Sequence, residues 1–158
     1  MSFCVMDTPV GHLRLDEEAG CITGVNRTTL PLCVPHTPLL KECARQLIAY
    51  FAGELMEFDL PLRAVGTPFR MRVWAELQQI PYGQAISYGE LARRIGNPQA
   101  SRAVGGANHH NPISILIPCH RVIGADGSLT GYGGGLDMKQ WLLAHEQLTL
   151  SKYCTDCD

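Results

Sequence analysis

Long hydrophobic runs are absent from this 158-residue chain, although 46% of its residues are hydrophobic. No apolar stretch approaches the roughly 20 residues that a membrane-spanning helix needs. Residues 1–16 also lack the basic start and the apolar core of a signal peptide. We therefore expect a cytoplasmic location, and a chain long enough to bury a core in one compact unit or two small ones.

The regular cysteine pattern of a disulfide-stabilised scaffold is missing as well. The seven cysteines are an odd number at scattered positions. A chain with this much apolar composition does not need disulfides to build a core. We expect the thiols to be reduced.

An overall excess of positive charge is also lacking, since the formal net charge is -2. The charge is nevertheless uneven. Residues 63–121 contain seven arginines and only two acidic residues, Glu76 and Glu90, so this segment carries +5 and the rest of the chain -7. Clustered basic side chains are what phosphate binding uses, so this segment has the charge for contact with a polyanion. A solvated arginine face is the alternative interpretation of the charge alone.

The first part of the chain has the pattern of a small sheet covered by one helix. Short strands are predicted over residues 2–7, 12–16 and 21–27, separated by turn residues, which indicates a meander. Thr37-Pro38 is a helix start, and apolar residues then recur at helical spacing until Gly53. The composition changes from acidic to basic within residues 54–66. We therefore predict an N-terminal domain over 1–64, a second domain over 65–150 and a tail over 151–158.

The second domain has the pattern of a helix-turn-helix. Thr67-Pro68 starts one helix, and Ser87-Tyr88-Gly89-Glu90 is a capping box that starts a short one ending at Gly96. Asn97-Pro98 is predicted to cap a third helix from Gln99 to about Asn108, built of small residues around Arg102. Two glycines inside this helix cost about 1 kcal/mol each relative to alanine, so either a DNA groove or close helix packing must explain them.

Cys119 is the candidate nucleophile. An apolar run over 113–117 predicts a buried strand that leads into Pro118-Cys119-His120-Arg121. The thiolate is the reactive form of cysteine, and His120 and Arg121 offer a base and a positive charge to generate it. Neighbouring residues of an extended chain point to opposite sides, so a bridging water could join Cys119 to His120. Glu146 is the best carboxylate by residue type to orient the imidazole, although a buried structural cysteine is the alternative.

Several segments, in this order, carry a resemblance to a known family. The longest runs from Asn111 to Gly124, and the others are Thr67-Pro68-Phe69, Ile80-Pro81-Tyr82-Gly83, Ser87-Tyr88, Gly96-Asn97-Pro98, 102–107, 131–136 and 141–146. Over roughly 65–148 the chain resembles the methylated-DNA–protein-cysteine methyltransferases, also called O6-alkylguanine-DNA alkyltransferases. The first part resembles them only in outline. The resemblance implies an α/β (α+β) fold with a ribonuclease H-like N-terminal domain and a mainly helical, winged helix-turn-helix-like alkyltransferase domain.

The same resemblance implies the chemistry. Cys119 would accept the alkyl group from O6-alkylguanine in DNA irreversibly, once per molecule, with O4-alkylthymine as a further candidate substrate. His120, acting through water with Glu146, would remove the thiol proton. Tyr88 would donate a proton to the departing guanine, and Asn111 would order the site.

Contacts with double-stranded DNA are implied as well, because O6 of guanine lies inside the duplex stack and the nucleotide must be rotated out. Arg102 would fill the gap, and the other residues implied to contact DNA are Ser101, Ala103, Gly105, Gly106 and Tyr88. The pocket for the base would be formed by Val122, Tyr132, Gly133 and Gly134, beside the backbone of Cys119. Many relatives carry serine or alanine where this chain has Gly133, so a hydroxyl contact to the base is missing there.

No cofactor is expected. Some relatives bind zinc in the first domain, but the spacing of Cys4, Cys21, Cys33-x-x-His36 and Cys154-x-x-Cys157 does not match a zinc site. The expected protein is a monomer that binds alkylated double-stranded DNA and no membrane.

Three other functions were weighed against alkyl transfer. Alkyltransferase-like sensors lack the reactive cysteine that this chain has. A helix-turn-helix regulator with a structural Cys119 is disfavoured by the negative net charge and by the absence of a dimerisation segment. A thiol hydrolase would need an oxyanion site, which the sequence does not show.

Overall fold

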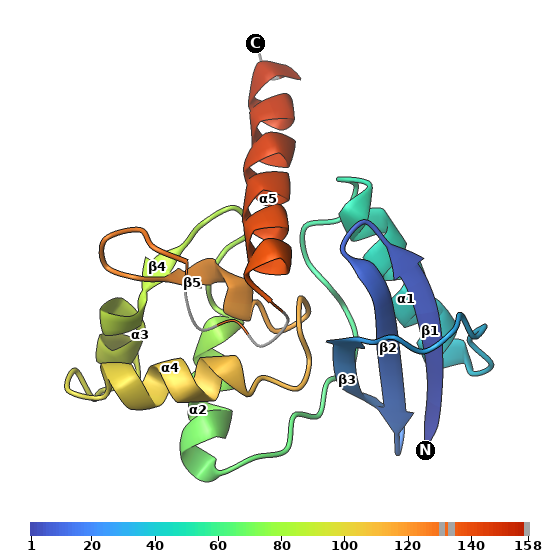
Figure 1. Ribbon diagram of the computed structural model, residues 1–158, viewed down its shortest axis with the longest axis horizontal. Helices are drawn as coiled ribbons and strands as arrows, with labels where there is room; N and C mark the ends of the chain where they lie inside the picture. The colour runs from blue at the N-terminus through green and yellow to red at the C-terminus, as the bar shows by residue number, and fades with distance from the viewer. Residues whose placement is uncertain (130–131, 133–134, 157–158) are drawn as a thin grey trace. The chain divides into compact units, whose positions relative to one another are not determined.

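The N-terminal sheet in the computed structural model is an antiparallel meander of β1 (Ser2–Thr8), β2 (Gly11–Glu18) and β3 (Cys21–Arg27) (Figure 1). The structure describes residues 1–129, 132 and 135–156, the last three of them by backbone only. Ala19 and Gly20, with φ of 53° and 79°, form the two-residue connection from β2 to β3. Positive φ at both positions suits the right-handed twist of a hairpin. The predicted meander is confirmed.

Helix α1 (Pro38–Phe51) packs against the three strands. Thr37 caps it, because the side-chain oxygen of Thr37 accepts a hydrogen bond from the backbone N–H of Leu40 at 3.1 Å. The core of this unit is formed by side chains of the strands and of α1 that are at most 3% exposed, namely Cys4, Val5, Leu13, Leu15, Ile22, Val25, Leu40, Cys43, Leu47 and Tyr50. The predicted helix and its start are confirmed.

A distant segment extends the sheet beyond β3. Ile113 bridges Val25 in parallel, with Val25 N–H donating to the carbonyl of Pro112 and Ser114 N–H donating to the carbonyl of Val25, both at 3.0 Å. The residues of this segment therefore belong to the first of two compact units. The first unit is Met1–Val65 with Pro112–Leu116, and the second is Gly66–Asn111 with Ile117–Asp158. The domain boundaries predicted from composition had placed 112–116 in the second domain.

The strand predicted over 113–117 is wrong. All five residues are buried, but the chain turns back within the run because Ile115 has a φ of 72° and Leu116 N–H donates to the carbonyl of Ser114 at 2.8 Å. A hydrogen bond from residue i+2 to residue i around a positive φ is a γ-turn of the rare, strained kind. A β-branched residue in this conformation costs about 1–3 kcal/mol, which the surrounding packing must offset.

The second unit begins with α2 (Pro68–Leu77), whose cap is Thr67. Its buried stripe of Val73, Trp74 and Leu77 faces the rest of the unit, and the indole N–H of Trp74 donates to the carbonyl of Ala107 at 2.9 Å. Helix α3 (Tyr88–Arg94) begins after Ser87, whose hydroxyl accepts from Glu90 N–H at 3.0 Å. This half of the predicted capping box is confirmed, while the carboxylate of Glu90 accepts from Arg93 and Arg94.

Helix α4 (Ser101–His109) starts two residues later than predicted. Ala100 N–H donates to the carbonyl of Asn97 at 3.0 Å, so Asn97 and Pro98 form a turn before the helix and do not cap it. Ala100 is the N-cap and makes no side-chain cap hydrogen bond. The pair α3 and α4 retains the helix-turn-helix order (Figure 1).

The remaining elements frame Cys119. The 3₁₀ turn η1 (Cys119–Arg121) leads into β5 (Val122–Ile123), which pairs in parallel with β4 (Ile86–Ser87). Helix α5 (Leu136–Asp156) packs against η1. It extends through much of the segment predicted as a tail, so residues 151–156 are helical. In the described ranges, no helix combines the length and the apolar composition needed to cross a bilayer.

Candidate active site

Cys119 is held at the start of η1 by a turn that Pro118 favours. Pro118 has φ of -79° and ψ of 65°, and Cys119 N–H donates to the carbonyl of Ile117 at 2.7 Å. These are the angles of an inverse γ-turn, and proline is restricted to nearly this φ. Arg121 N–H then donates to the carbonyl of Pro118 at 3.0 Å and closes the 3₁₀ turn. The sequence Pro-Cys-His-Arg thus places the thiol where the turn begins.

Two asparagines from α4 and the chain after it fix the position of the cysteine. The Nδ2 group of Asn111 donates to Cys119 Sγ at 3.1 Å and to the carbonyl of Ile117 at 2.8 Å. The Nδ2 group of Asn108 donates to the carbonyl of Cys119 at 3.2 Å. Asn111 was predicted as an ordering residue, whereas Asn108 was not singled out. The sulfur therefore has an oriented donor that favours its ionised form.

Burial keeps the thiol protonated at rest. Cys119 is 2% exposed, and this burial raises its pKa to about 11. A hydrogen bond from Asn111, the positive charge of Lys139 and a contact with Tyr132 act in the opposite direction but do not outweigh burial. A base must therefore take the proton when the sulfur reacts.

His120 and Glu146 form the buried pair that was predicted for this purpose. His120 Nε2 lies 2.7 Å from Glu146 Oε2, and the side chains are 0% and 1% exposed. A carboxylate only accepts hydrogen bonds, so Nε2 carries the hydrogen. Burial lowers the pKa of His120 below its ordinary value even though Glu146 acts to raise it. The imidazole is then neutral at pH 7, with its lone pair on Nδ1.

That Nδ1 atom is buried and has no hydrogen-bond partner among the described residues. A buried acceptor without a partner is costly, and native proteins satisfy such atoms with water or with a reacting group. Because η1 is a 3₁₀ turn, the alternation of an extended chain that we expected for Cys119 and His120 does not apply. His120 has the protonation state of a base.

Arg121 holds Glu146 from the other side. Its Nε donates to Oε1 at 2.9 Å, its Nη2 donates to Oε2 at 3.0 Å, and its Nη1 donates to the carbonyl of Ile80 at 2.7 Å. Burial raises the pKa of Glu146, but the hydrogen bonds and charges of His120 and then Arg121 outweigh it and leave the pKa well below its usual range. The carboxylate is therefore ionised. The sequence had suggested Arg121 only as a source of positive field.

Tyr88 and Lys139 meet on the other side of the sulfur. Tyr88 begins α3, and Lys139 Nζ, near the start of α5, lies 3.4 Å from its hydroxyl oxygen and 5.6 Å from its ring centroid. The Lys139 side chain is 0% exposed, and its charge lowers the pKa of Cys119. The sequence analysis missed this residue. Helical spacing is the signal that could have found it, because Lys139 lies two turns before Glu146 on α5 and so shares its face.

The predicted pocket residues are only partly described. Val122 is 0% exposed and Tyr132 is 5% exposed. Gly133 and Gly134 lie outside the described residues, so the predicted pocket contacts there stay a prediction.

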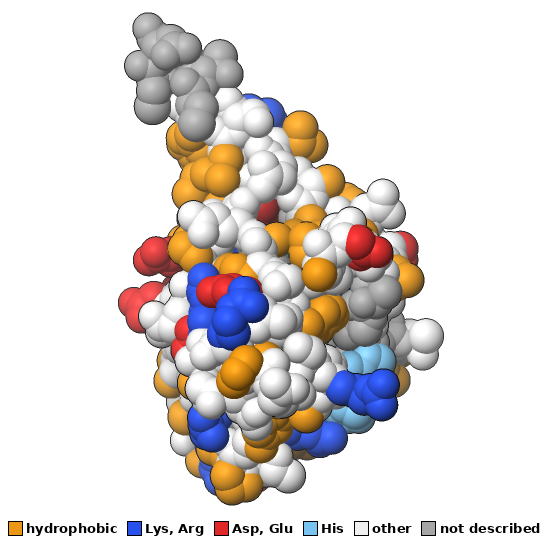
Figure 2. Space-filling model, turned by 90° about the vertical axis from the view of Figure 1, so that its left-hand side faces the viewer, with side chains coloured by type: hydrophobic (Ala, Val, Ile, Leu, Met, Phe, Trp, Pro, Cys, Tyr) orange, Lys and Arg blue, Asp and Glu red, His pale blue; other side chains and the backbone are white. Residues whose placement is uncertain are grey.

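Helix α4 presents small residues on its outer face. Arg102, Ala103 and Gly106 are exposed, Ser101 and Gly105 are half-buried, and Val104 and Ala107 face the interior. Figure 2 shows Lys and Arg side chains spread over the side of the molecule that carries α3 and α4, one group of them around an acidic side chain. The exposed face of α4 therefore combines an arginine with little side-chain bulk.

The two glycines of α4 are not required by packing inside the unit. A Cβ atom on Gly106 would meet no described atom within 4 Å, and one on Gly105 would meet the Tyr88 ring at 3.9 Å, an ordinary contact. Of the two explanations that the sequence left open, close packing against another helix is thus unsupported. A glycine that nothing in the fold requires favours close approach of an external partner.

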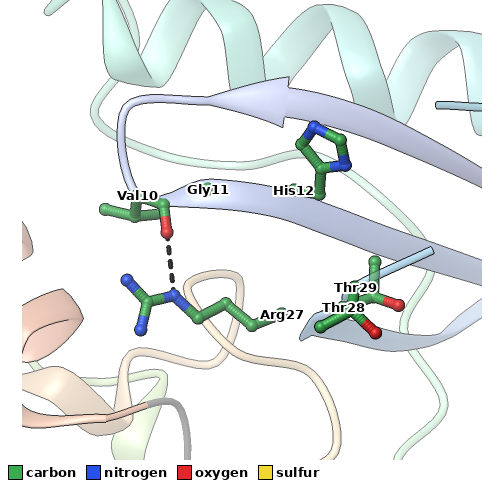
Figure 3. A pocket seen from close by; sticks show the side chains of 6 residues that line it. All are labelled: Val10, Gly11, His12, Arg27, Thr28 and Thr29. Atoms are coloured by element: carbon green, nitrogen blue, oxygen red, sulfur yellow. Dashed lines mark hydrogen bonds between the residues drawn. The ribbon is translucent and has the colours of Figure 1, made fainter. Parts of the chain in front are cut away.

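A hollow in the first unit is explained by the fold itself. It is lined by Val10, Gly11, His12, Arg27, Thr28 and Thr29 (Figure 3). Arg27 Nε donates to the carbonyl of Val10 at 2.8 Å, and His12 Nδ1 lies 3.0 Å from the carbonyl of Leu30. These contacts tie the β1–β2 turn to the chain after β3.

A metal site was not found within the described part of the chain, where no three His, Cys, Asp or Glu side chains are grouped to hold an ion. Cys4 and Cys43 are buried, and Cys21 and Cys33 are half-buried free thiols. The side chains of Cys154 and Cys157 lie outside the described residues.

Comparison with protein families covers both units. Residues 3–64 match the model of the 6-O-methylguanine DNA methyltransferase ribonuclease-like domain, and residues 68–148 match that of the 6-O-methylguanine DNA methyltransferase DNA-binding domain. The two matches together span most of the chain.

Individual relatives agree with these matches. The chain is 48% identical over 153 residues to a methylated-DNA–protein-cysteine methyltransferase of Methanosarcina acetivorans, covering 92% of this chain and 98% of that one. It is 52% identical to the protein of the same name from Mycolicibacterium paratuberculosis, covering 93% of each. The crystal structure of Mycobacterium tuberculosis OGT in complex with DNA superposes with a TM-score of 0.86 at 47% identity, covering 93% of each chain.

These similarities run through both units and through every motif quoted from the sequence. They confirm the α/β fold with a ribonuclease-like first part and a DNA-binding second part. The chain therefore belongs to the 6-O-methylguanine DNA methyltransferase family.

Proposed function

We propose that this protein repairs DNA by transferring the alkyl group from O6 of guanine to Sγ of Cys119, and that each molecule does so once. The observation that carries the proposal is the buried thiol beside a neutral histidine whose partner is an ionised glutamate. The name of the relatives describes transfer from methylated DNA to a protein cysteine. O4-alkylthymine is a further candidate substrate.

The proton route follows from the protonation states. The thiol proton passes to Nδ1 of His120 through a water molecule, and the imidazolium that forms is stabilised by the carboxylate of Glu146, 2.7 Å from Nε2. The sulfur then attacks the alkyl carbon. The S–C bond forms as the C–O6 bond breaks, and the bonding electron pair leaves with the guanine.

Tyr88 supplies the second proton of the reaction. Its hydroxyl donates to the departing guanine, which would otherwise leave as an anion. Asn111 orients the sulfur throughout through its 3.1 Å contact. The product on Cys119 is a thioether, which has no good leaving group and no reductant that would reset it, so the protein is consumed.

The outer face of α4 is the proposed contact with duplex DNA. Arg102 enters the stack in place of the flipped nucleotide, and Ser101, Ala103, Gly105 and Gly106 allow the helix backbone to approach the minor groove closely. Tyr88 lies beside this helix, with its ring 3.9 Å from the position of a Cβ on Gly105. The flipped base would occupy a pocket formed by Val122, Tyr132, Gly133 and Gly134. We further infer that the protein acts as a monomer in the cytoplasm without a cofactor.

Intact-mass measurement tests the proposal directly. After incubation with a duplex carrying O6-methylguanine, the protein is expected to gain about 14 Da at Cys119, the mass of one CH2 group, because a covalent adduct stays on the nucleophile. The amount of repaired DNA should equal the amount of protein. An unmodified protein, or repair of many lesions per molecule, would contradict the proposal.

Replacing Arg102 with alanine tests the proposed role of α4. The Arg102→Ala variant is expected to lose about 100-fold or more in transfer rate on duplex DNA, because nothing then offsets the few kcal/mol lost on unstacking the nucleotide. The rate with free O6-methylguanine base should stay close to that of the wild type. Arg63→Ala, a change of an arginine in the first unit, is the matched control. Equal losses on duplex and free base would rule out the intercalating role.

A further inference from the structure

Lys139 is a buried cation that the proposed reaction does not yet use. Its side chain is 0% exposed at the start of α5. Burying an ammonium group is costly unless its environment compensates, so such lysines are rarely placed by packing alone. The residue therefore needs an explanation from the groups that it meets.

The groups that face Lys139 belong to the reaction centre. From α3, the Tyr88 hydroxyl oxygen lies 3.4 Å from Nζ, and the ring centroid lies 5.6 Å away. From η1, Cys119 and His120 both interact with the lysine charge, which lowers the pKa of each. An ammonium group donates hydrogen bonds and accepts none, so Tyr88 Oη is the acceptor in its contact with Lys139.

This direction leaves the hydrogen of the Tyr88 hydroxyl for another acceptor. A hydroxyl that accepts from a cation becomes a stronger donor, and a nearby positive charge stabilises the phenolate that remains after the proton has left. The electrostatic effect is strong because the site is buried.

We infer that Lys139 is a positioning residue that acts through Tyr88, directing the tyrosine hydrogen toward the leaving base and stabilising the phenolate. The inference rests on the proposed function. In the step, the C–O6 bond breaks and its electron pair stays with the purine, the tyrosine proton moves to the purine, and the negative charge remains on Oη beside the ammonium. The proton that left Cys119 is on His120, so the protons balance.

The acid–base properties of the lysine suit this role. Burial lowers its pKa to about 8, although the negative charge of the Cys119 thiolate acts to raise it. The ammonium is thus present at neutral pH and is lost as the pH rises through about 8. The rate of transfer from duplex DNA is expected to fall over the same range.

A double-mutant cycle tests the inference. Lys139→Met is expected to slow transfer from an O6-methylguanine duplex by about 100-fold, within the usual effect of general acid catalysis. In a Tyr88→Phe background the same change should alter the rate by less than about 2-fold, since the group through which it acts is gone. Equal slowing in both backgrounds would overturn the inference. Lys139→Arg, which keeps the positive charge, should recover part of the rate.

Iodomethane separates this effect from one on the sulfur. Its leaving group is iodide, which needs no proton, so Lys139→Met should slow methylation of Cys119 by iodomethane far less than transfer from DNA. Equal slowing would mean that the lysine acts on the thiol alone. The same reaction also reports whether each variant is folded around Cys119.

The wild-type protein provides a test that does not depend on a folded Lys139 variant. Its rate on duplex DNA should fall above pH 8, and this fall should be absent in Tyr88→Phe. A fall of the same size in Tyr88→Phe would contradict the inference. If the wild type takes up no methyl group at all, the proposed function itself fails, whereas normal uptake with an unchanged Lys139→Met rate removes only the lysine role.

Discussion

Replacing Cys119 with alanine is expected to abolish alkyl transfer completely and to leave the affinity for DNA unchanged. The sulfur is the atom that forms the new bond, and the proposed DNA contacts come from α4. The change removes one small buried side chain, so we expect a loss of about 1 kcal/mol in stability and a folded protein. Intact mass after incubation with a lesion-bearing duplex measures transfer, and fluorescence anisotropy with the same duplex measures affinity.

Cys43→Ala is the matched control. Cys43 is 0% exposed in α1, and burial raises the pKa of its thiol to about 12, so it is a buried cysteine without a base. This variant should still take up one alkyl group. Uptake by Cys119→Ala, or failure of Cys43→Ala to react in a folded state, would show that the acceptor has been misassigned.

Replacing Glu146 with glutamine is expected to damage both stability and activity. The amide cannot match the two hydrogen bonds and the charge that Arg121 receives, and Arg121 is only 6% exposed. Leaving a buried charge without its partner costs about 3–5 kcal/mol. The amide can also donate to His120 Nε2, which would move the imidazole hydrogen to Nδ1 and remove the base. Transfer should slow by about 100-fold to 10,000-fold.

Urea unfolding and single-turnover kinetics measure the two effects of Glu146→Gln. Its partners hold the pKa of Glu146 below the ordinary 4.5 despite burial, so the stabilisation is complete above pH 4.5 and is lost as the pH falls through the folded-state value. The stability difference between wild type and variant should therefore shrink in acid. Glu42→Gln, which alters an exposed ion pair with Arg45, should change neither quantity appreciably. A variant as stable and as fast as the wild type would refute the buried triad.

The starts of helices were predictable because their causes are local. Thr37, Thr67 and Ser87 each cap the helix that follows through a hydrogen bond to a backbone N–H three residues later. The same reasoning failed at Asn97, where the turn closed by Ala100 N–H replaced the expected cap. A cap residue competes with other turns of similar length, and a sequence shows both options without their energies.

The apolar run at 113–117 shows where hydrophobic pattern reaches its limit. Five buried residues in a row are compatible with a strand, and the sequence shows no glycine to mark the left-handed conformation at Ile115. The turn exists because part of the segment pairs with Val25, nearly ninety positions away in the sequence. Such long-range pairing can hold a strained residue that local preference would exclude.

The sequence by itself determined the family, the nucleophile and the identity of its base and carboxylate, because these depend on residue types in a long and specific order of motifs. Only the tertiary structure decided that the thiol is protonated at rest, that Arg121 clamps Glu146 and that Lys139 meets Tyr88. Those properties depend on burial and on distances of a few ångströms between segments far apart in the chain. Residue order does not contain the dielectric environment of a side chain, and packing creates it.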